Sequence, residues 1–205
     1  MRLQQFINED INTDMFLDLT RLIFTKCKPY LNNMKKRPEI TRLFSGMDSY
    51  KNVDTIQIKK NRAPKDTPLA LHRDFDDLFY KKFGWKARSE AAFCTTNSMY
   101  ISSTFGKSYV FFPIGNFKVL YHKHISDLLE VLEELEIVDY TTELMIDDMV
   151  FLKERLFDVV KEYKQETNTI SADILKRPVE LMFKCSAYYL VNEKVYNSIY
   201  KELFI

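Results

Sequence analysis

Residues 180–191 read Glu-Leu-Met-Phe-Lys-Cys-Ser-Ala-Tyr-Tyr-Leu-Val, and this largely apolar stretch carries the most weight in deciding the fold. A run of aromatic, aliphatic and β-branched residues of this length is typical of a buried strand. Ala91 to Thr95 and Tyr109 to Ile114 have the same character, and shorter candidates lie at 40–46 and 53–58. We therefore expect these segments to form the sheet structure, with residues 180–191 as one strand run.

Helical spacing of apolar residues occurs between and after these strands. Thr67-Pro68 places a hydroxyl cap before a proline, which is a preferred helix start, and Gly84 is suited to end that helix. The other segments with helical spacing are 12–29, 126–135, 143–165 and 192–205. Strands and helices do not alternate strictly, and this order favours the α+β class.

The length and composition of the chain fit one folded unit. Its 205 residues suit a single domain, and the 46% of apolar residues can form a buried core, which excludes a disordered protein. We expect one domain over 1–205. Within it, residues 1–38 form an N-terminal helical segment, 40–191 the core and 192–205 a C-terminal helix.

Several functional classes are excluded by residue usage. The four glycines are isolated, so no glycine-rich phosphate loop of the Rossmann or Walker type can form. The three cysteines lie far apart, which favours a reduced, intracellular setting. The sequence contains no Cys-x-x-Cys or His-x-x-x-His pair, so it offers no paired ligands for a metal ion. The N-terminal residues lack a hydrophobic signal core, and no apolar run reaches 18 residues. We expect a soluble cytoplasmic protein with no metal and no membrane partner.

Charge is balanced overall but segregated along the chain. Thirty basic and 29 acidic residues give a formal charge of +1. Residues 26–62 nevertheless hold ten Lys or Arg against three Asp or Glu, whereas residues 125–166 hold four against thirteen. Two solvated faces would explain this pattern, and so would a basic surface beside a site for a dinucleotide or a nucleic acid.

Three separated segments together resemble the ADP-ribosyltransferase-like proteins, especially the small members encoded by tailed bacteriophages. The segments are Leu43-Phe-Ser-Gly-Met47, Phe93-Cys-Thr-Thr-Asn97 and Glu180-Leu-Met-Phe183. They are similar, in this order, to the opening strand of the family, its aromatic-x-Ser-Thr-Ser strand and the strand that begins at its catalytic glutamate. Connecting blocks similar to the phage group lie at 62–68, 83–89 and 105–113. The resemblance covers roughly residues 40–191.

The resemblance implies a fold, a substrate and a set of site residues. The fold is α+β, with a split antiparallel sheet around a cleft and with flanking helices. The substrate is NAD, from which ADP-ribose passes to a macromolecule, protein or nucleic acid. Glu180 would stabilise the positive charge that develops on the ribose, and Thr95 or Thr96 would hold the carboxylate and the nicotinamide. The residues implied in NAD binding are Ser45, Gly46, Arg62, Arg88, Phe105 and Tyr109, the last two through ring stacking.

Two positions depart from the family pattern. The family has an arginine where this chain has Ser45, so another cation, Arg62 or Arg88, must bind the pyrophosphate if NAD is bound. Pro178 stands where many members carry the Gln or Glu that engages the acceptor, which weakens arginine-directed transfer.

Three functions remain open at this point. The first is an NAD-dependent mono-ADP-ribosyltransferase, acting in the host cytoplasm if the chain is viral. The second is a catalytically inactive scaffold of the same fold, acting as a phage binding or virion-associated protein. The third is a nucleic-acid-binding accessory protein that uses the basic segment 26–62.

Overall fold

The computed structural model describes residues 13–36, 42–62, 67–128 and 146–204, and these residues form an α+β fold. Eight helices are present in the described residues: α1 (Thr13–Lys26), α2 (Lys28–Met34), α3 (Leu69–Phe83), α4 (Ala87–Glu90), α5 (Ser98–Thr104), α7 (Ile146–Glu162), α8 (Ala172–Leu175) and α9 (Glu193–Phe204). Eight strands accompany them: β1 (Phe44–Met47), β2 (Val53–Gln57), β3 (Ala92–Cys94), β4 (Lys107–Pro113), β5 (Lys118–Tyr121), β6 (Lys164–Thr167), β7 (Leu181–Lys184) and β8 (Ala187–Asn192). The predicted fold class is confirmed at this level.

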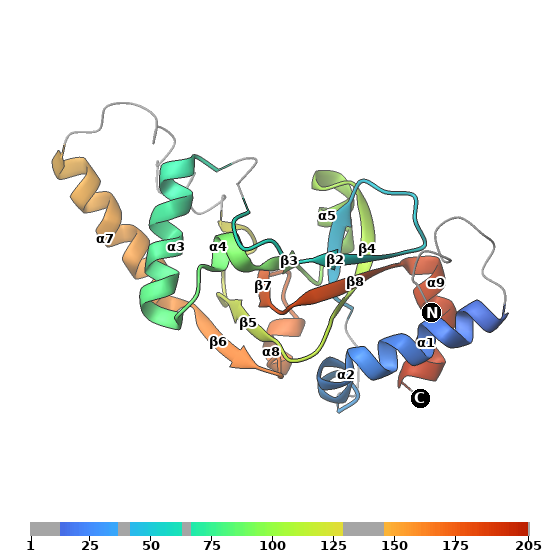
Figure 1. The fold of residues 1–205 in the computed structure, drawn as a ribbon. Coiled ribbons are helices and arrows are strands. Elements are labelled where there is room, and N and C mark those ends of the chain that lie inside the picture. Colours follow the sequence, from blue (N-terminus) through green and yellow to red (C-terminus); the bar gives the residue numbers. More distant parts are fainter. Residues whose placement is uncertain (1–12, 37–41, 63–66, 129–145, 205) are drawn as a thin grey trace.

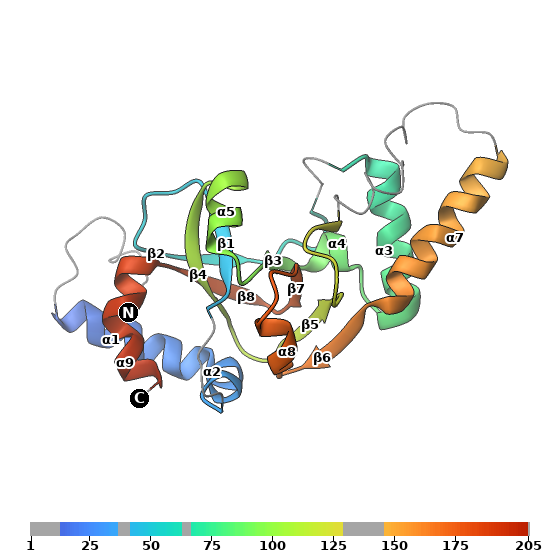
Figure 2. The same cartoon turned by 180° about the vertical axis from the view of Figure 1, so that it is seen from behind.

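The strands form two four-stranded antiparallel sheets. Sheet A has the order β1-β4-β8-β2, and sheet B has the order β3-β7-β5-β6. Figures 1 and 2 show the sheets in the middle of the molecule, with α3 and α7 at one end and α1, α2 and α9 at the other. The central strands β4 and β7 have mostly buried residues, as strands enclosed on both faces require.

The run from Glu180 to Val191 is not one strand, and this is a correction to the sequence prediction. It contains β7 of sheet B and β8 of sheet A, and the chain passes between the sheets at Cys185 and Ser186. The crossing is held by the N–H of Ile58, which donates to the carbonyl of Ser186 at 3.3 Å. Because both strands are buried, the apolar pattern continues through the crossing and does not reveal it.

A bridge between Phe44 and Thr95 joins the two sheets directly. The N–H of Phe44 donates to the carbonyl of Thr95 at 2.7 Å, and the N–H of Thr95 donates to the carbonyl of Phe44 at 2.9 Å. Phe44 begins β1 in sheet A, and Thr95 follows β3 in sheet B. The bridge therefore keeps these two strand ends next to each other.

The helix boundaries confirm some predictions and correct others. Gly84 ends α3 in the left-handed conformation at φ 77°, as expected, but Thr67 does not cap this helix. The segment predicted as a helix over 12–29 breaks at Cys27, after which α2 starts with Pro29 in its first turn. The predicted cap at Asn12 and most of the helix at 126–135 lie outside the described residues.

The last two predicted helices differ in outcome. α7 ends at Glu162, and Lys164–Thr167 form the strand β6, so the predicted helix over 143–165 is wrong at its C-terminal end. Pairing with β5 outweighs the helical pattern there. α9 has the expected buried face, made by Val195, Ile199 and Leu203.

Candidate functional site

A cavity of about 660 Å³ is lined by residues of both sheets. Its walls come from β1, β2 and β8 of sheet A, from β3 of sheet B, and from α3, α4, α5 and the segment before β7. Seven of the residues singled out from the sequence line it: Ser45, Gly46, Arg62, Arg88, Thr95, Phe105 and Glu180. This volume lies within the range of cavities that hold small ligands.

Glu180 lies immediately before β7, with its side chain 16% exposed. Its N–H donates to the carbonyl of Ile125 at 3.4 Å, which ties the start of the strand to a neighbouring segment. Nη1 of Arg88 lies 3.0 Å from Oε1 and 3.3 Å from Oε2 of Glu180. Burial raises the pKa of Glu180, as does nearby Asp127, and Arg88 opposes both effects by favouring the charged carboxylate.

Arg88 is positioned by a buried polar cluster that joins α3 to α4. Oδ1 of Asp76 accepts the N–H of Arg88 at 2.8 Å and the N–H of Ser89 at 3.2 Å, and Oδ2 accepts the hydroxyl of Ser89. Nε2 of His72 lies 2.9 Å from the same hydroxyl oxygen. Burial lowers the pKa of His72, which favours its neutral form. The cluster fixes the backbone from which the guanidinium of Arg88 extends.

Arg62 and Arg88 meet at one aromatic ring. The guanidinium carbon of Arg62 lies 4.5 Å from the ring centroid of Phe93, and that of Arg88 lies 4.8 Å from it. The N–H of Arg62 also donates to the carbonyl of Ser89 at 3.2 Å, so the loop that carries Arg62 is attached to α4. Both guanidiniums are therefore held at the same part of the cavity wall.

Asp127 is a second carboxylate in the cavity, and no sequence motif marks it. It is 8% exposed, and its Oδ2 accepts the hydroxyl of Tyr100, which also lines the cavity. In the sequence Asp127 is only one acid in the first turn of a predicted acidic helix. No local pattern distinguishes it from the acids that follow, so only the fold identifies it.

The two threonines have different positions. Thr95 is buried, lines the cavity and accepts the N–H of Asn97 at its hydroxyl oxygen at 3.3 Å. Thr96 is not among the cavity-lining residues; its hydroxyl donates to the carbonyl of Arg177 at 2.7 Å. Thr96 thus anchors the segment that leads to Glu180, whereas Thr95 forms part of the cavity wall.

Ser45 and Gly46 lie in β1 and line the cavity, and close packing against Phe105 requires a glycine at position 46. Ser45 is 8% exposed and carries no charge that could bind an anion by itself. A Cβ at Gly46 would lie 2.4 Å from Cβ and 2.8 Å from the carbonyl oxygen of Phe105, so only glycine allows this close approach. Phe105 is 45% exposed and packs edge-on against Tyr100 at 5.8 Å between ring centroids.

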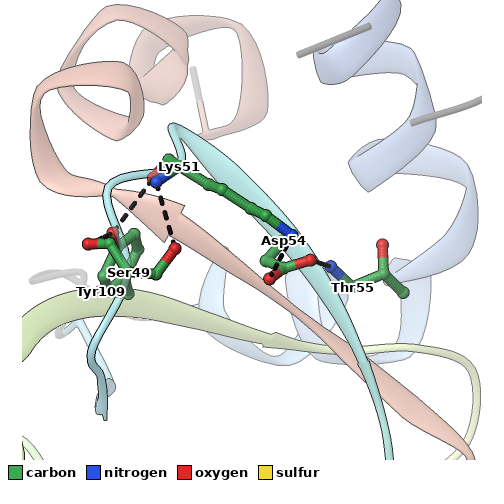
Figure 3. A network of polar contacts seen from close by, with 5 residues as sticks. All are labelled: Ser49, Lys51, Asp54, Thr55 and Tyr109. Atoms are coloured by element: carbon green, nitrogen blue, oxygen red, sulfur yellow. Dashed lines mark hydrogen bonds and ion pairs between the residues drawn. The ribbon is translucent and has the colours of Figure 1, made fainter. Parts of the chain in front are cut away.

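Tyr109 is not brought to the cavity, in contrast to the stacking role implied by the resemblance. Its side chain is fully buried, and its hydroxyl donates to the carbonyls of Ser49 at 2.8 Å and Lys51 at 3.1 Å (Figure 3). Nζ of Lys51 in turn lies 3.2 Å from Oδ2 of Asp54. Through these hydrogen bonds, Tyr109 stabilises the connection between β1 and β2.

The described residues contain no group of three or more His, Cys, Asp or Glu side chains placed to hold a metal ion. Among them there is also no helix with the length and apolar character needed to cross a membrane. The cavity instead combines cations with carboxylates, since Lys59, Arg62 and Arg88 line it together with Asp127 and Glu180. No protein family, no curated protein and no solved structure matches this chain.

Proposed function

We propose that the protein is an NAD-dependent mono-ADP-ribosyltransferase that transfers ADP-ribose to a protein or nucleic acid, with the two sheets as the split sheet of that fold. One observation carries the proposal. Residues from all three segments that resemble the family line the same cavity: Ser45 and Gly46, Phe93 to Thr95, and Glu180. These segments are far apart in the sequence, and their meeting in one cavity is what the resemblance implies.

The carboxylate of Glu180 supplies the electrostatic part of the chemistry. NAD contributes a bond between nicotinamide and ribose whose cleavage builds positive charge on the ribose. A carboxylate held in a partly buried cavity stabilises such charge more strongly than one in water. Burial raises the pKa of Glu180, and Arg88 favours the ionised form that this role requires.

The two arginines replace the cation that Ser45 does not provide. The guanidiniums of Arg62 and Arg88 lie over one ring and line the same cavity. Arginine binds phosphate oxygens through several directed hydrogen bonds, so this pair suits a pyrophosphate group. Phe105, with its half-exposed ring, offers an apolar face for a flat base or nicotinamide ring.

The test is release of nicotinamide from NAD by the purified protein, with Glu180→Gln as the variant. We expect release by the wild type and a loss of about a hundredfold or more in the variant, because the substituted amide carries no charge. Glu193→Gln is the matched control, since Glu193 also pairs with an arginine but lies at the surface. Equal rates in wild type and Glu180→Gln would contradict the assignment of Glu180.

A second candidate function is a catalytically inactive scaffold that binds a partner. Two observations favour it. The carboxylate of Glu180 is already paired with Arg88, and Ser45 carries no charge that could bind a phosphate. A ligand that binds only the folded state raises its stability. Absence of both nicotinamide release and thermal stabilisation by millimolar NAD would favour the scaffold.

A further inference from the structure

We propose that Arg88 exchanges partners in the cavity. In the free protein it pairs with Glu180; when a diphosphate group binds, Arg88 and Arg62 together bind the phosphate oxygens and Glu180 is released. This inference rests on the proposed function, because it describes how the same site takes the phosphates of its substrate. It adds that the carboxylate becomes free only once the phosphates are bound.

The guanidiniums of Arg62 and Arg88 lie over the same aromatic ring of the cavity wall. Both lie over Phe93, at 4.5 and 4.8 Å from its centroid, so their separation is at most the sum of these distances. Like charges repel each other, and in the free protein Glu180 is the anion that offsets them, because both arginines favour its ionised form by lowering its pKa. A diphosphate carries several negative oxygens, so we expect it to compete with this carboxylate for the guanidiniums.

The existing ion pair uses one nitrogen atom of Arg88. Both hydrogen bonds from Arg88 to Glu180 come from the same atom, Nη1, at 3.0 and 3.3 Å. Arginine forms its strongest pairs through two parallel bonds from two nitrogen atoms. The pair with Glu180 therefore uses one nitrogen atom of the guanidinium, whereas a phosphate could accept hydrogen bonds from two. A phosphate can thus compete with Glu180 for Arg88.

The charge of the cavity lining and the fixed backbone of Arg88 also favour an exchange. Three cations, Lys59, Arg62 and Arg88, line the cavity together with two carboxylates, those of Asp127 and Glu180, so the charges of its lining residues sum to a net positive charge. The backbone of Arg88 is fixed by a buried carboxylate in α3, through a bond of 2.8 Å to its N–H. An exchange of partners thus requires movement of side chains only.

The experiment measures the binding of inorganic pyrophosphate by calorimetry, at low salt and without NAD. Removing the charge of Glu180 removes the competitor for Arg88, so we expect Glu180→Gln to lower the Kd about tenfold relative to the wild type. Arg62→Gln and Arg88→Gln should each raise the Kd about tenfold or more. Circular dichroism and thermal unfolding establish that each variant is folded.

Arg42→Gln is the matched control. The guanidinium of Arg42 also lies over an aromatic ring, at 4.8 Å from the centroid of Tyr196, and pairs with a glutamate, but it does not line the cavity. Its Kd should stay within about twofold of the wild-type value. An unchanged or higher Kd in folded Glu180→Gln would overturn the exchange, as would the absence of pyrophosphate binding in every variant.

The outcome is separable from that of the proposed function. Tighter pyrophosphate binding in Glu180→Gln, without nicotinamide release from NAD by the wild type, would support the exchange and contradict the enzyme. Nicotinamide release that depends on Glu180, with pyrophosphate binding insensitive to this residue, would support the enzyme and overturn the exchange.

Discussion

Two arginine–glutamate pairs in this molecule use the same chemical groups in different surroundings. Nη1 of Arg88 lies 3.0 Å from Oε1 of Glu180, and the two side chains are 11% and 16% exposed. Nη1 of Arg42 lies 3.9 Å from Oε2 of Glu193, and these side chains are 36% and 39% exposed. Each arginine also lies 4.8 Å from the centroid of an aromatic ring. The difference between the pairs is therefore mainly one of burial and distance.

Burial changes how much each charged side chain relies on its ion-pair partner. At the surface, water solvates either charge when its partner is removed, so the pair contributes little to stability. In the cavity wall, each charge relies on the other for the solvation that it has lost. Such a pair is weak evidence for a stabilising role, and a shifted pKa beside a cavity is typical of a functional site.

The largest expected effect comes from removing each arginine in turn. Arg88→Met should lower the free energy of unfolding by about 3 kcal/mol, because Glu180 is left buried without its partner. Arg42→Met should lower it by less than about 1 kcal/mol. Urea denaturation of both variants at neutral pH measures the difference, and equal losses would show that burial does not distinguish the two pairs.

The next effect concerns the carboxylate that holds the backbone of Arg88. Asp76→Ala removes the acceptor of two backbone N–H groups and one hydroxyl; both bonds from Ser89 are buried and the one from Arg88 is partly buried. We expect a loss of about 2 kcal/mol in urea denaturation. Asp77→Ala, an exposed neighbour on the same helix, should change stability by no more than about 0.5 kcal/mol. Similar losses in both would contradict the anchoring role of Asp76.

The smallest effect is a dependence on pH that follows from the buried pair. Burial raises the pKa of Glu180 in the folded protein, so this side chain holds its proton more tightly there than in the unfolded chain. The stability that it contributes is complete below the ordinary pKa of glutamate and is lost as the pH rises through the raised value. As the pH rises above the ordinary pKa of glutamate, about 4.3, the free energy of unfolding of the wild type should therefore fall relative to that of Glu180→Gln.

Arg88→Gln sharpens this prediction. Arg88 lowers the pKa of Glu180, so without it the pKa lies higher still and the loss of stability extends to higher pH. Urea denaturation across this pH range measures both curves. A pH-independent difference between the wild type and Glu180→Gln would show that the carboxylate is not perturbed by folding.

Parts of the fold and site that depend on local pattern could be predicted from the sequence. The strand at Tyr109 to Ile114, the end of α3 at Gly84 and the buried face of α9 all follow from local spacing or turn chemistry. The crossing at Cys185 could not be predicted, because it depends on pairing with strands far away in the sequence. β6 was missed for the same reason, since its neighbour β5 outweighs a helical pattern.

The candidate site divides in a similar way. Residues within quoted motifs, such as Glu180 and Gly46, could be singled out because the motif marks them. Asp127 could not, because its partner Tyr100 lies in another segment and neither residue has a distinctive neighbourhood. Tyr109 was placed in the site by its motif, yet its hydroxyl fastens a turn. Burial of an aromatic ring is decided by the whole fold.

The topology also sets the order in which the protein can assemble during synthesis. β7 lies between β3 and β5, and β8 lies between β4 and β2, so neither sheet can close before residues 181–192 have been made. At ordinary rates of translation, β8 is synthesised on the order of ten seconds after β4, with which it pairs. Throughout that interval the edge of β4 that later pairs with β8 is open, and an open edge can pair with another chain.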